Sequence, residues 1–230
     1  SLDFDGATVA GTTWNTGFKV PTIVAAPYGL DADPTTFSAA EQAAIRQVYE
    51  RVAEDYAPFD INVTTVDPGV AALVGTGPGD SRYGQRVVIT NTDWYQTATG
   101  KRTGGIAYLD VFGDDADLPA WVFAGNLANG KAKSVAEAVS HEAGHTFGLR
   151  HDGIGGQDYH PGNADWGPIM GAGYGAVQTQ WSKGEYPGAT RTNEDDLAII
   201  AERAPFVKDD HGNDPGTATA LSLPASVSSA

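Results

Sequence analysis

The 230-residue sequence contains no cysteine. This absence excludes a disulfide framework, a cysteine-based zinc finger and a thiol nucleophile. A chain of this length can bury a sizeable hydrophobic core without disulfides. The length therefore predicts one large domain or two lobes around a cleft.

Basic residues and long apolar runs are scarce as well. The chain has 14 Lys and Arg against 29 Asp and Glu, which gives a formal net charge of −15 at pH 7. Such a charge argues against nucleic acid or an anionic membrane as a partner. No segment approaches the ~20 apolar residues of a membrane-spanning helix, and the first residues lack the basic and hydrophobic regions of a signal peptide. We expect no nucleic-acid partner, no membrane span, and no signal peptide within this chain.

One segment, HEAGHTFGLRHD at 141–152, carries most of the chemical information. In an α-helix, His141 and His145 lie one turn apart on the same face, so both imidazoles can reach a single ion. Glu142 flanks that face. A continued helix would carry His151 about 9 Å beyond His145, too far to share the ion. We therefore expect the helix to end between the two.

Gly148 is the residue at which the helix can end, because glycine adopts the left-handed conformation without a Cβ penalty. The chain can then turn back and bring His151 to the same ion. Three neutral imidazoles leave the fourth position of a tetrahedral zinc open for water, which is typical of catalytic zinc. Zinc lowers the pKa of that water to about 7, and Glu142 can accept its proton and deliver it to the leaving amine. A bare HExxH arises by chance often, but the extension through Asp152 makes coincidence a poor explanation.

The segment resembles the HExxHxxGxxH signature of metzincin zinc peptidases, and Asp152 gives it most similarity to the adamalysin or reprolysin branch. Met170, the only methionine, matches the methionine turn that metzincins place beneath the metal. Astacins and serralysins carry a tyrosine two residues after that methionine, where this chain has Ala172. Adamalysins are usually rich in disulfides, which this chain lacks. The resemblance is specific from about Ser134 to Tyr174, is architectural elsewhere, and suggests a bacterial secreted metzincin.

This resemblance implies an α+β zincin/metzincin fold, with a twisted mixed β-sheet, a catalytic helix and a smaller C-terminal lobe. It implies one catalytic zinc ion held by His141, His145 and His151. Glu142 would be the catalytic base. Gly148, Asp152 and Met170 would support the site. For Asp152 the alternative is a solvated loop aspartate.

The expected domain boundaries follow from the same resemblance and from composition. Residues 1–207 would form the catalytic domain, with an upper lobe at about 1–148 and a lower lobe at about 149–207. Residues 208–230 are rich in Asp, Gly, Ala and Ser. This composition predicts a linker or the start of a removed C-terminal domain.

Local patterns predict the regular elements around the motif. The first expected helix begins at Ser38, with a Ser38–Glu41 capping box, and ends before Pro58. The second begins at Ser134, with a Ser134–Glu137 capping box, and ends at Phe147. The third begins near Asn193 and ends at Pro205. The expected strands are 61–64, 86–90, 104–112 and 121–123.

The strand at 104–112 is expected to border the cleft, where an extended protein or peptide substrate could add to its edge. Its candidate substrate-binding residues are Gly105, Ile106, Ala107 and Tyr108; an ordinary edge strand is the alternative. Tyr174 is a further candidate, either lining a substrate pocket or hydrogen-bonding the developing oxyanion, with simple packing as the alternative.

Two other polar features have weaker signals. Residues 113–117 contain three aspartates that could hold calcium, but a solvated acidic loop is the simpler interpretation. His160 and His211 lack partners at ligand spacing, so surface positions are expected for both.

The sequence thus favours a secreted, extracellular zinc metalloendopeptidase, with the localisation resting on the resemblance. One alternative is a non-catalytic, zinc-stabilised binding or adhesion module, against which the intact Glu142 argues. Another is a specialised peptidase that requires a glycosylated or particular host protein. The sequence carries no signal for a particular oligomeric state.

Overall fold

The computed structural model describes residues 1–208, 211–212, 214 and 216–220. Its centre is a four-stranded mixed sheet in the order β1-β4-β6-β5. The strands are β1 (Leu2–Asp3), β4 (Val87–Thr90), β5 (Gly105–Ile106) and β6 (Ala120–Phe123). β1, β4 and β6 run parallel, and β5 pairs antiparallel to β6 at the edge. All residues of β4 and β6 are buried, as expected for apolar strands covered on both faces.

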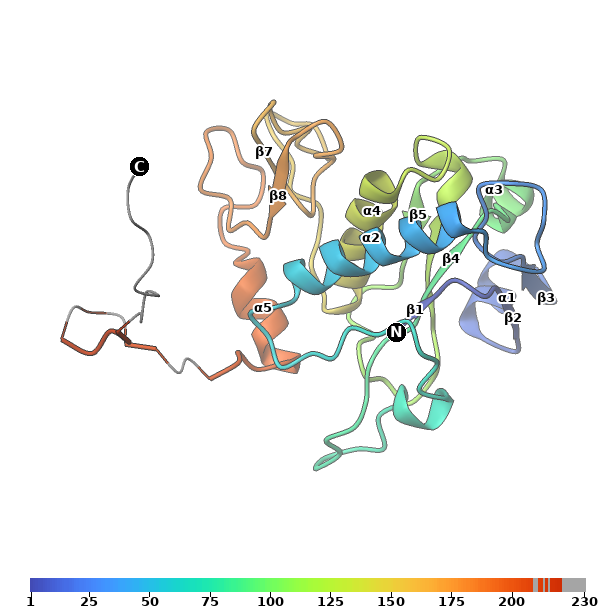
Figure 1. Ribbon diagram of the computed structural model, residues 1–230, viewed down its shortest axis with the longest axis horizontal. Coiled ribbons are helices and arrows are strands. Elements are labelled where there is room, and N and C mark those ends of the chain that lie inside the picture. The colour runs from blue at the N-terminus through green and yellow to red at the C-terminus, as the bar shows by residue number, and fades with distance from the viewer. Residues whose placement is uncertain (209–210, 213, 215, 221–230) are drawn as a thin grey trace, which may run out of the picture.

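Two long helices cover one face of this sheet, α2 (Ala39–Asp55) and α4 (Ala132–Thr146) (Figure 1). α2 begins at Ser38 with the predicted capping box: Glu41 N donates to Ser38 Oγ at 3.4 Å, and Ser38 N donates to Glu41 Oε2 at 2.7 Å. The side chains that share this core include Val48, Val52, Val87, Ile89, Val122, Val135 and Val139. The histidine-bearing helix is therefore held between the sheet and α2.

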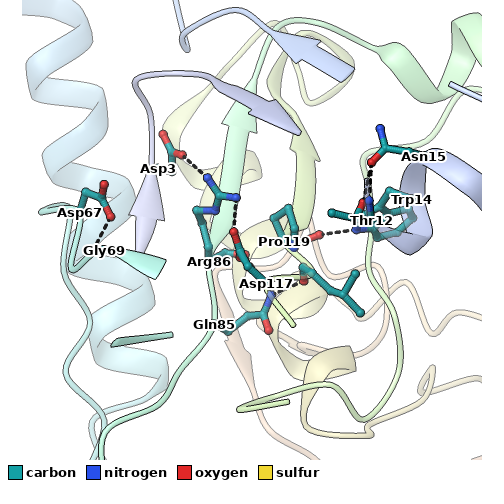
Figure 2. A network of polar contacts seen from close by, with 11 residues as sticks. Asp3, Thr12, Trp14, Asn15, Asp67, Gly69, Gln85, Arg86, Asp117 and Pro119 are labelled. Atoms are coloured by element: carbon teal, nitrogen blue, oxygen red, sulfur yellow. Dashed lines mark hydrogen bonds and ion pairs between the residues drawn. The ribbon is translucent and has the colours of Figure 1, made fainter. Parts of the chain in front are cut away.

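The opposite face is covered by smaller elements and an aromatic cluster. These elements are the antiparallel hairpin β2 (Ala7–Ala10) and β3 (Thr22–Ala25) with the short helices α1 (Thr13–Phe18) and α3 (Trp94–Thr99). Val88, Trp121 and Phe123 alternate with the residues that face α2 and α4, so the two-residue period of the strands divides the two cores. Trp14 in α1 donates its indole N–H to Pro119 O at 2.9 Å (Figure 2).

An arginine fixes the first strand to the sheet. Arg86 lies 3.7 Å from Asp3 and also pairs with Asp117 (Figure 2). The side chain of Gln85 donates to Leu118 O at 2.7 Å. These contacts join three segments that are distant in sequence: β1, the residues before β4 and the residues before β6.

The chain beyond the histidine motif is largely irregular. It contains the short parallel pair β7 (Trp166–Pro168) and β8 (Gln178–Gln180), followed by α5 (Asp196–Arg203) (Figure 1). Two single-turn 3-10 helices occur earlier, at Val70–Ala72 and Ala124–Asn126. The α+β architecture, with its mixed sheet and histidine-bearing helix, confirms the predicted fold class.

Several predicted elements need correction. Residues 61–64 form no strand; a single backbone hydrogen bond, from Leu2 N to Thr64 O at 2.8 Å, links this segment to β1. The strand predicted at 104–112 is confined to β5, and the chain forms a turn at 109–110. The capping box predicted at Ser134 is wrong: α4 begins two residues earlier, and Glu137 pairs with Lys133 at 3.2 Å instead.

No helix among the described residues is long and apolar enough to cross a membrane. The predicted linker at 208–230 lies in large part outside the described residues, and the 1–207 boundary stays a prediction. The chain remains attached to the core up to that boundary. Val207 N donates to Pro58 O at 2.9 Å, and the rings of Phe206 and Phe59 stack with centroids 5.2 Å apart.

Truncation tests this boundary. Removing the residues after Val207 should leave the midpoint of thermal unfolding nearly unchanged, because the last backbone and ring contacts with Phe59 and Pro58 are retained. Removing the residues after Pro205 also deletes Phe206 and should lower the midpoint by roughly 2–6 °C. Calorimetry of the two truncated proteins beside the parent measures both effects. A large loss in the Val207 truncation would show that the boundary is misplaced.

Candidate active site

The end of α4 determines where the third histidine lies. Gly148 adopts φ +104°, its N–H donates to His145 O at 2.9 Å, and Leu149 N donates to Gly144 O at 3.3 Å. This pair of hydrogen bonds is a Schellman ending with glycine at the left-handed position. The predicted end of the helix is therefore confirmed, and the chain turns back toward the face that carries His141.

The turn brings the three predicted ligands together. One nitrogen from each of His141, His145 and His151 lies within 4.8 Å of the other two, and this is the only such group of three among the described residues. Nε2 of His145 and Nε2 of His151 are 3.1 Å apart. Three nitrogen donors at these separations match the donor number of a catalytic zinc site.

Backbone carbonyls orient the two helical histidines. Nδ1 of His141 contacts Ile169 O at 2.9 Å, and Nδ1 of His145 contacts Leu149 O at 2.7 Å. A carbonyl can only accept, so each Nδ1 carries the proton and each Nε2 presents its lone pair. The tautomer that suits a metal ligand is thus set by the Gly148 turn for His145 and by the methionine turn for His141.

Burial keeps the imidazoles neutral. It lowers the pKa of His141 to about 3 and, with the neighbouring His145, lowers the pKa of His151 to about 4. The pKa of His145 is also lowered, again mainly by burial. Neutral imidazoles near pH 7 are the form that binds zinc, so the donor set fits this metal without a protonation cost.

Glu142 lies in a buried position beside the edge strand. It is 7% exposed, and burial raises the pKa of its carboxyl to about 8. A Cβ at Gly105 would lie 2.6 Å from Glu142 Oε1 and 2.7 Å from Trp121 O. Glycine at position 105 therefore allows β5 to lie directly against the carboxyl group, which the sequence pattern alone did not indicate.

The methionine turn packs beneath the helix. Gly171 N donates to Pro168 O at 3.1 Å and closes the turn that carries Met170, whose side chain is fully buried. A Cβ at Gly144 would lie 2.6 Å from Met170 Sδ. Gly144 therefore makes room for the sulfur under the histidine face, although it was not among the predicted site residues.

Asp152 is also buried, at 3% exposed, which removes the alternative of a solvated loop aspartate. Its N–H donates to Met170 O at 2.8 Å, and Tyr186 Oη donates to its Oδ1 at 3.5 Å. Burial raises the pKa of its carboxyl to about 6. Asp152 thus joins the segment after His151 to the methionine turn, and its supporting role in the site stays a prediction.

The predicted substrate-binding residues separate into two groups. Gly105 and Ile106 form β5 beside α4, and the hydroxyl of Tyr174 lies 3.5 Å from the Cβ position of Gly104. Ala107 and Tyr108 follow the strand, and the Tyr108 ring packs on Trp14 with centroids 4.2 Å apart. Gly105 and Tyr174 therefore lie near Glu142, while the side chains of Ile106 and Tyr108 pack against the opposite aromatic core.

The remaining polar predictions have mixed outcomes. His160 is 8% exposed, so its expected surface position is wrong; its ring packs on Tyr186 with centroids 4.5 Å apart. His211 is exposed, as expected. In the acidic segment 113–117, Asp117 pairs with Arg86, and calcium there stays a prediction. Tyr159 was not among the predicted site residues, and its ring lies on His151 with centroids 4.1 Å apart.

The contact between β5 and Glu142 generates a prediction. Gly105→Ala should push the carboxyl group or the strand away, because neither the Glu142 side chain nor Trp121 O can share the space. Casein hydrolysis, the activity expected from the motif, should fall about 100-fold, while zinc content stays unchanged. Gly125→Ala, where a Cβ meets nothing within 4 Å, is the matched control. Parent-like hydrolysis by Gly105→Ala would refute the importance of this contact.

Comparison with known proteins agrees with the geometry. The model of the reprolysin-like metallopeptidase family M12B matches residues 70–152, a range that includes β5, α4 and all three histidines. The match ends at Asp152, so the methionine turn extends the likeness beyond it. A search of curated proteins found no significant match. The family match and the three-histidine cluster together support a zinc metallopeptidase that is similar, over residues 70–152, to the reprolysin-like M12B family.

Proposed function

We propose that this chain is the catalytic domain of a secreted zinc metalloendopeptidase in which Glu142 is the general base. The observation that carries the proposal is the position of Glu142, buried between the metal-ligand face of α4 and the edge strand β5. Secretion is supported by the resemblance to bacterial secreted metzincins.

His141, His145 and His151 would hold the zinc ion, because their donor atoms converge and their rings are neutral. When bound, zinc lowers the pKa of water at its open coordination position to about 7 and polarises the scissile carbonyl. The hydrogen bonds that orient His141 and His145 would help to hold the ion next to Glu142.

Glu142 would move the proton. Its carboxylate removes a proton from the attacking water as the new C–O bond forms, and the resulting carboxyl group delivers that proton to the amide nitrogen as the C–N bond breaks. Burial raises the pKa of Glu142, and a nearby cation would favour its ionised form. These opposing effects bring the group toward a pKa at which it can both accept and donate a proton near neutral pH.

The edge strand would align the peptide. β5 is the last strand of the sheet, and β6 is its only strand partner among the described residues. An extended substrate could pair with the outer edge of Gly105 and Ile106, and main-chain hydrogen bonds would hold it without regard to its sequence. The Tyr174 hydroxyl lies next to this edge, in a position to contact the bound peptide. The substrate is accordingly a protein or peptide segment in extended conformation.

Two variants of α4 test the assignment of the base. Glu142→Gln preserves size and leaves the three histidines in place, so zinc should stay bound while casein hydrolysis falls 10²–10⁴-fold, roughly 3–5 kcal/mol of barrier. His145→Ala should lose both zinc and activity. Zinc content and hydrolysis rate are measured together on each purified variant.

Glu137→Gln is the matched control, because Glu137 lies on the same helix and pairs with Lys133 rather than with the metal site. It should retain zinc and most of the activity. Hydrolysis by Glu142→Gln at the parental rate would show that Glu142 is not the base. Zinc retention without hydrolysis in the parent itself would favour the alternative of a zinc-stabilised binding module.

A further inference from the structure

The three histidines differ in how their rings are held. His141 and His145 each contact a backbone carbonyl through Nδ1. Within the described part of the chain, His151 has no such partner, and its one contact at hydrogen-bond distance is with Nε2 of His145. Metal-binding imidazoles usually gain their orientation from a hydrogen bond at the nitrogen that does not bind the metal. The orientation of His151 therefore depends on packing.

Tyr159 provides that packing. Its ring centroid lies 4.1 Å from that of His151, with an angle of 32° between the planes, and 6.0 Å from that of His141 at 25°. Tyr159 is 43% exposed. One side of the phenol ring thus covers the imidazole of His151, while part of the side chain remains exposed to solvent.

The backbone next to Tyr159 is held firmly at both sides of the site. His160 N donates to Asp152 O at 2.6 Å, and His160 O accepts from Ala172 N at 2.8 Å. The buried His160 side chain packs on Tyr186 and accepts a hydrogen bond from a backbone N–H. His160, the residue that follows Tyr159, is therefore hydrogen-bonded both to Asp152, next to His151, and to Ala172, after the methionine turn. A side chain supported in this way can hold another ring in place.

Core filling does not explain this arrangement, because Tyr159 is nearly half exposed. Tyr174 makes a useful comparison. It is 41% exposed, and its pKa is raised by burial and by Glu142, as is that of Tyr159. Among the described residues, however, Tyr174 has no ring contact with an imidazole. The two tyrosines therefore have similar environments, but only Tyr159 has a ring contact with a histidine of the site.

We propose that Tyr159 is a positioning residue of the metal centre, whose ring holds the His151 imidazole in the orientation that completes the three-histidine site. The inference rests on the proposed function, since it takes His151 to be a zinc ligand. The aromatic ring is the group that acts, and the hydroxyl is not required for this role. The ring contact with Tyr159 takes the place of the hydrogen bond that orients each of the other two histidines.

Zinc affinity of the full chain tests the proposal. Metal-free protein is titrated with zinc in competition with a chromophoric chelator. Tyr159→Ala should weaken zinc binding about 10–100-fold, the usual loss when the partner of a metal-binding imidazole is removed. Tyr159→Phe keeps the ring and should bind zinc as tightly as the parent. Tyr174→Ala, the matched control, should also bind as the parent does.

A second measurement shows whether Tyr159 acts through His151. In a His151→Ala background, which retains two ligands, adding Tyr159→Ala should cause no further loss of zinc affinity. Thermal unfolding of the metal-free variants shows whether the fold is intact. If the alanine variant unfolds, Tyr159→Leu fills the space without a planar ring and should also weaken zinc binding.

Parental zinc affinity in Tyr159→Ala would overturn this inference and leave the proposed function standing. An equal loss in the His151→Ala background would also overturn it, because Tyr159 would then act elsewhere. A parent chain that binds no zinc would overturn the proposed function and this inference together. The two failures are therefore distinguishable in a single titration series.

Discussion

The left-handed conformation of Gly148 is the constraint on which the metal centre depends. It ends α4, whose last residue directly follows His145, and provides two backbone hydrogen bonds that replace those of a continuing helix. The same turn places Leu149 O against Nδ1 of His145 and returns the chain so that His151 can approach. A residue with a Cβ would be strained at this φ. One backbone conformation thus determines both the position of the third ligand and the tautomer of the second.

The segment that follows Gly148 supports the three histidines through contacts that are mostly buried. The methionine turn supplies Ile169 O to His141, and Asp152 connects that turn to the segment after His151. Asp196, at the first turn of α5, is 1% exposed; burial raises its pKa to about 8, and the charge of Asp152 adds to this shift. Two carboxyl groups are therefore held in a poorly solvated region next to the site, where their neutral forms are favoured. Asp196 also accepts a hydrogen bond from Ser182 N at 3.0 Å, which links α5 to the segment that follows β8.

Local signals predicted more of this structure than non-local ones did. The Ser38 capping box and the end of α4 at Gly148 were correct because each depends on hydrogen bonds within a few residues. Strand pairing at 61–64 was wrong, and β5 is shorter than predicted, because pairing depends on which distant segment lies alongside. In the site, helical spacing and the glycine predicted the convergence of the three histidines. The roles of Gly105, Gly144 and Tyr159 could not be predicted from the sequence. Each of these residues contacts a segment that is distant along the chain, and residue spacing does not show which distant segments lie together.

The zinc chemistry is tested most directly by metal analysis of the freshly purified chain combined with reversible chelation. One equivalent of zinc per chain is expected, and a strong chelator should abolish casein hydrolysis because three neutral imidazoles leave the ion exchangeable. Adding back one equivalent of zinc to the metal-free protein should restore the activity. Protein that contains no zinc and whose hydrolysis is indifferent to the chelator would contradict the assignment of His141, His145 and His151 as the catalytic metal site.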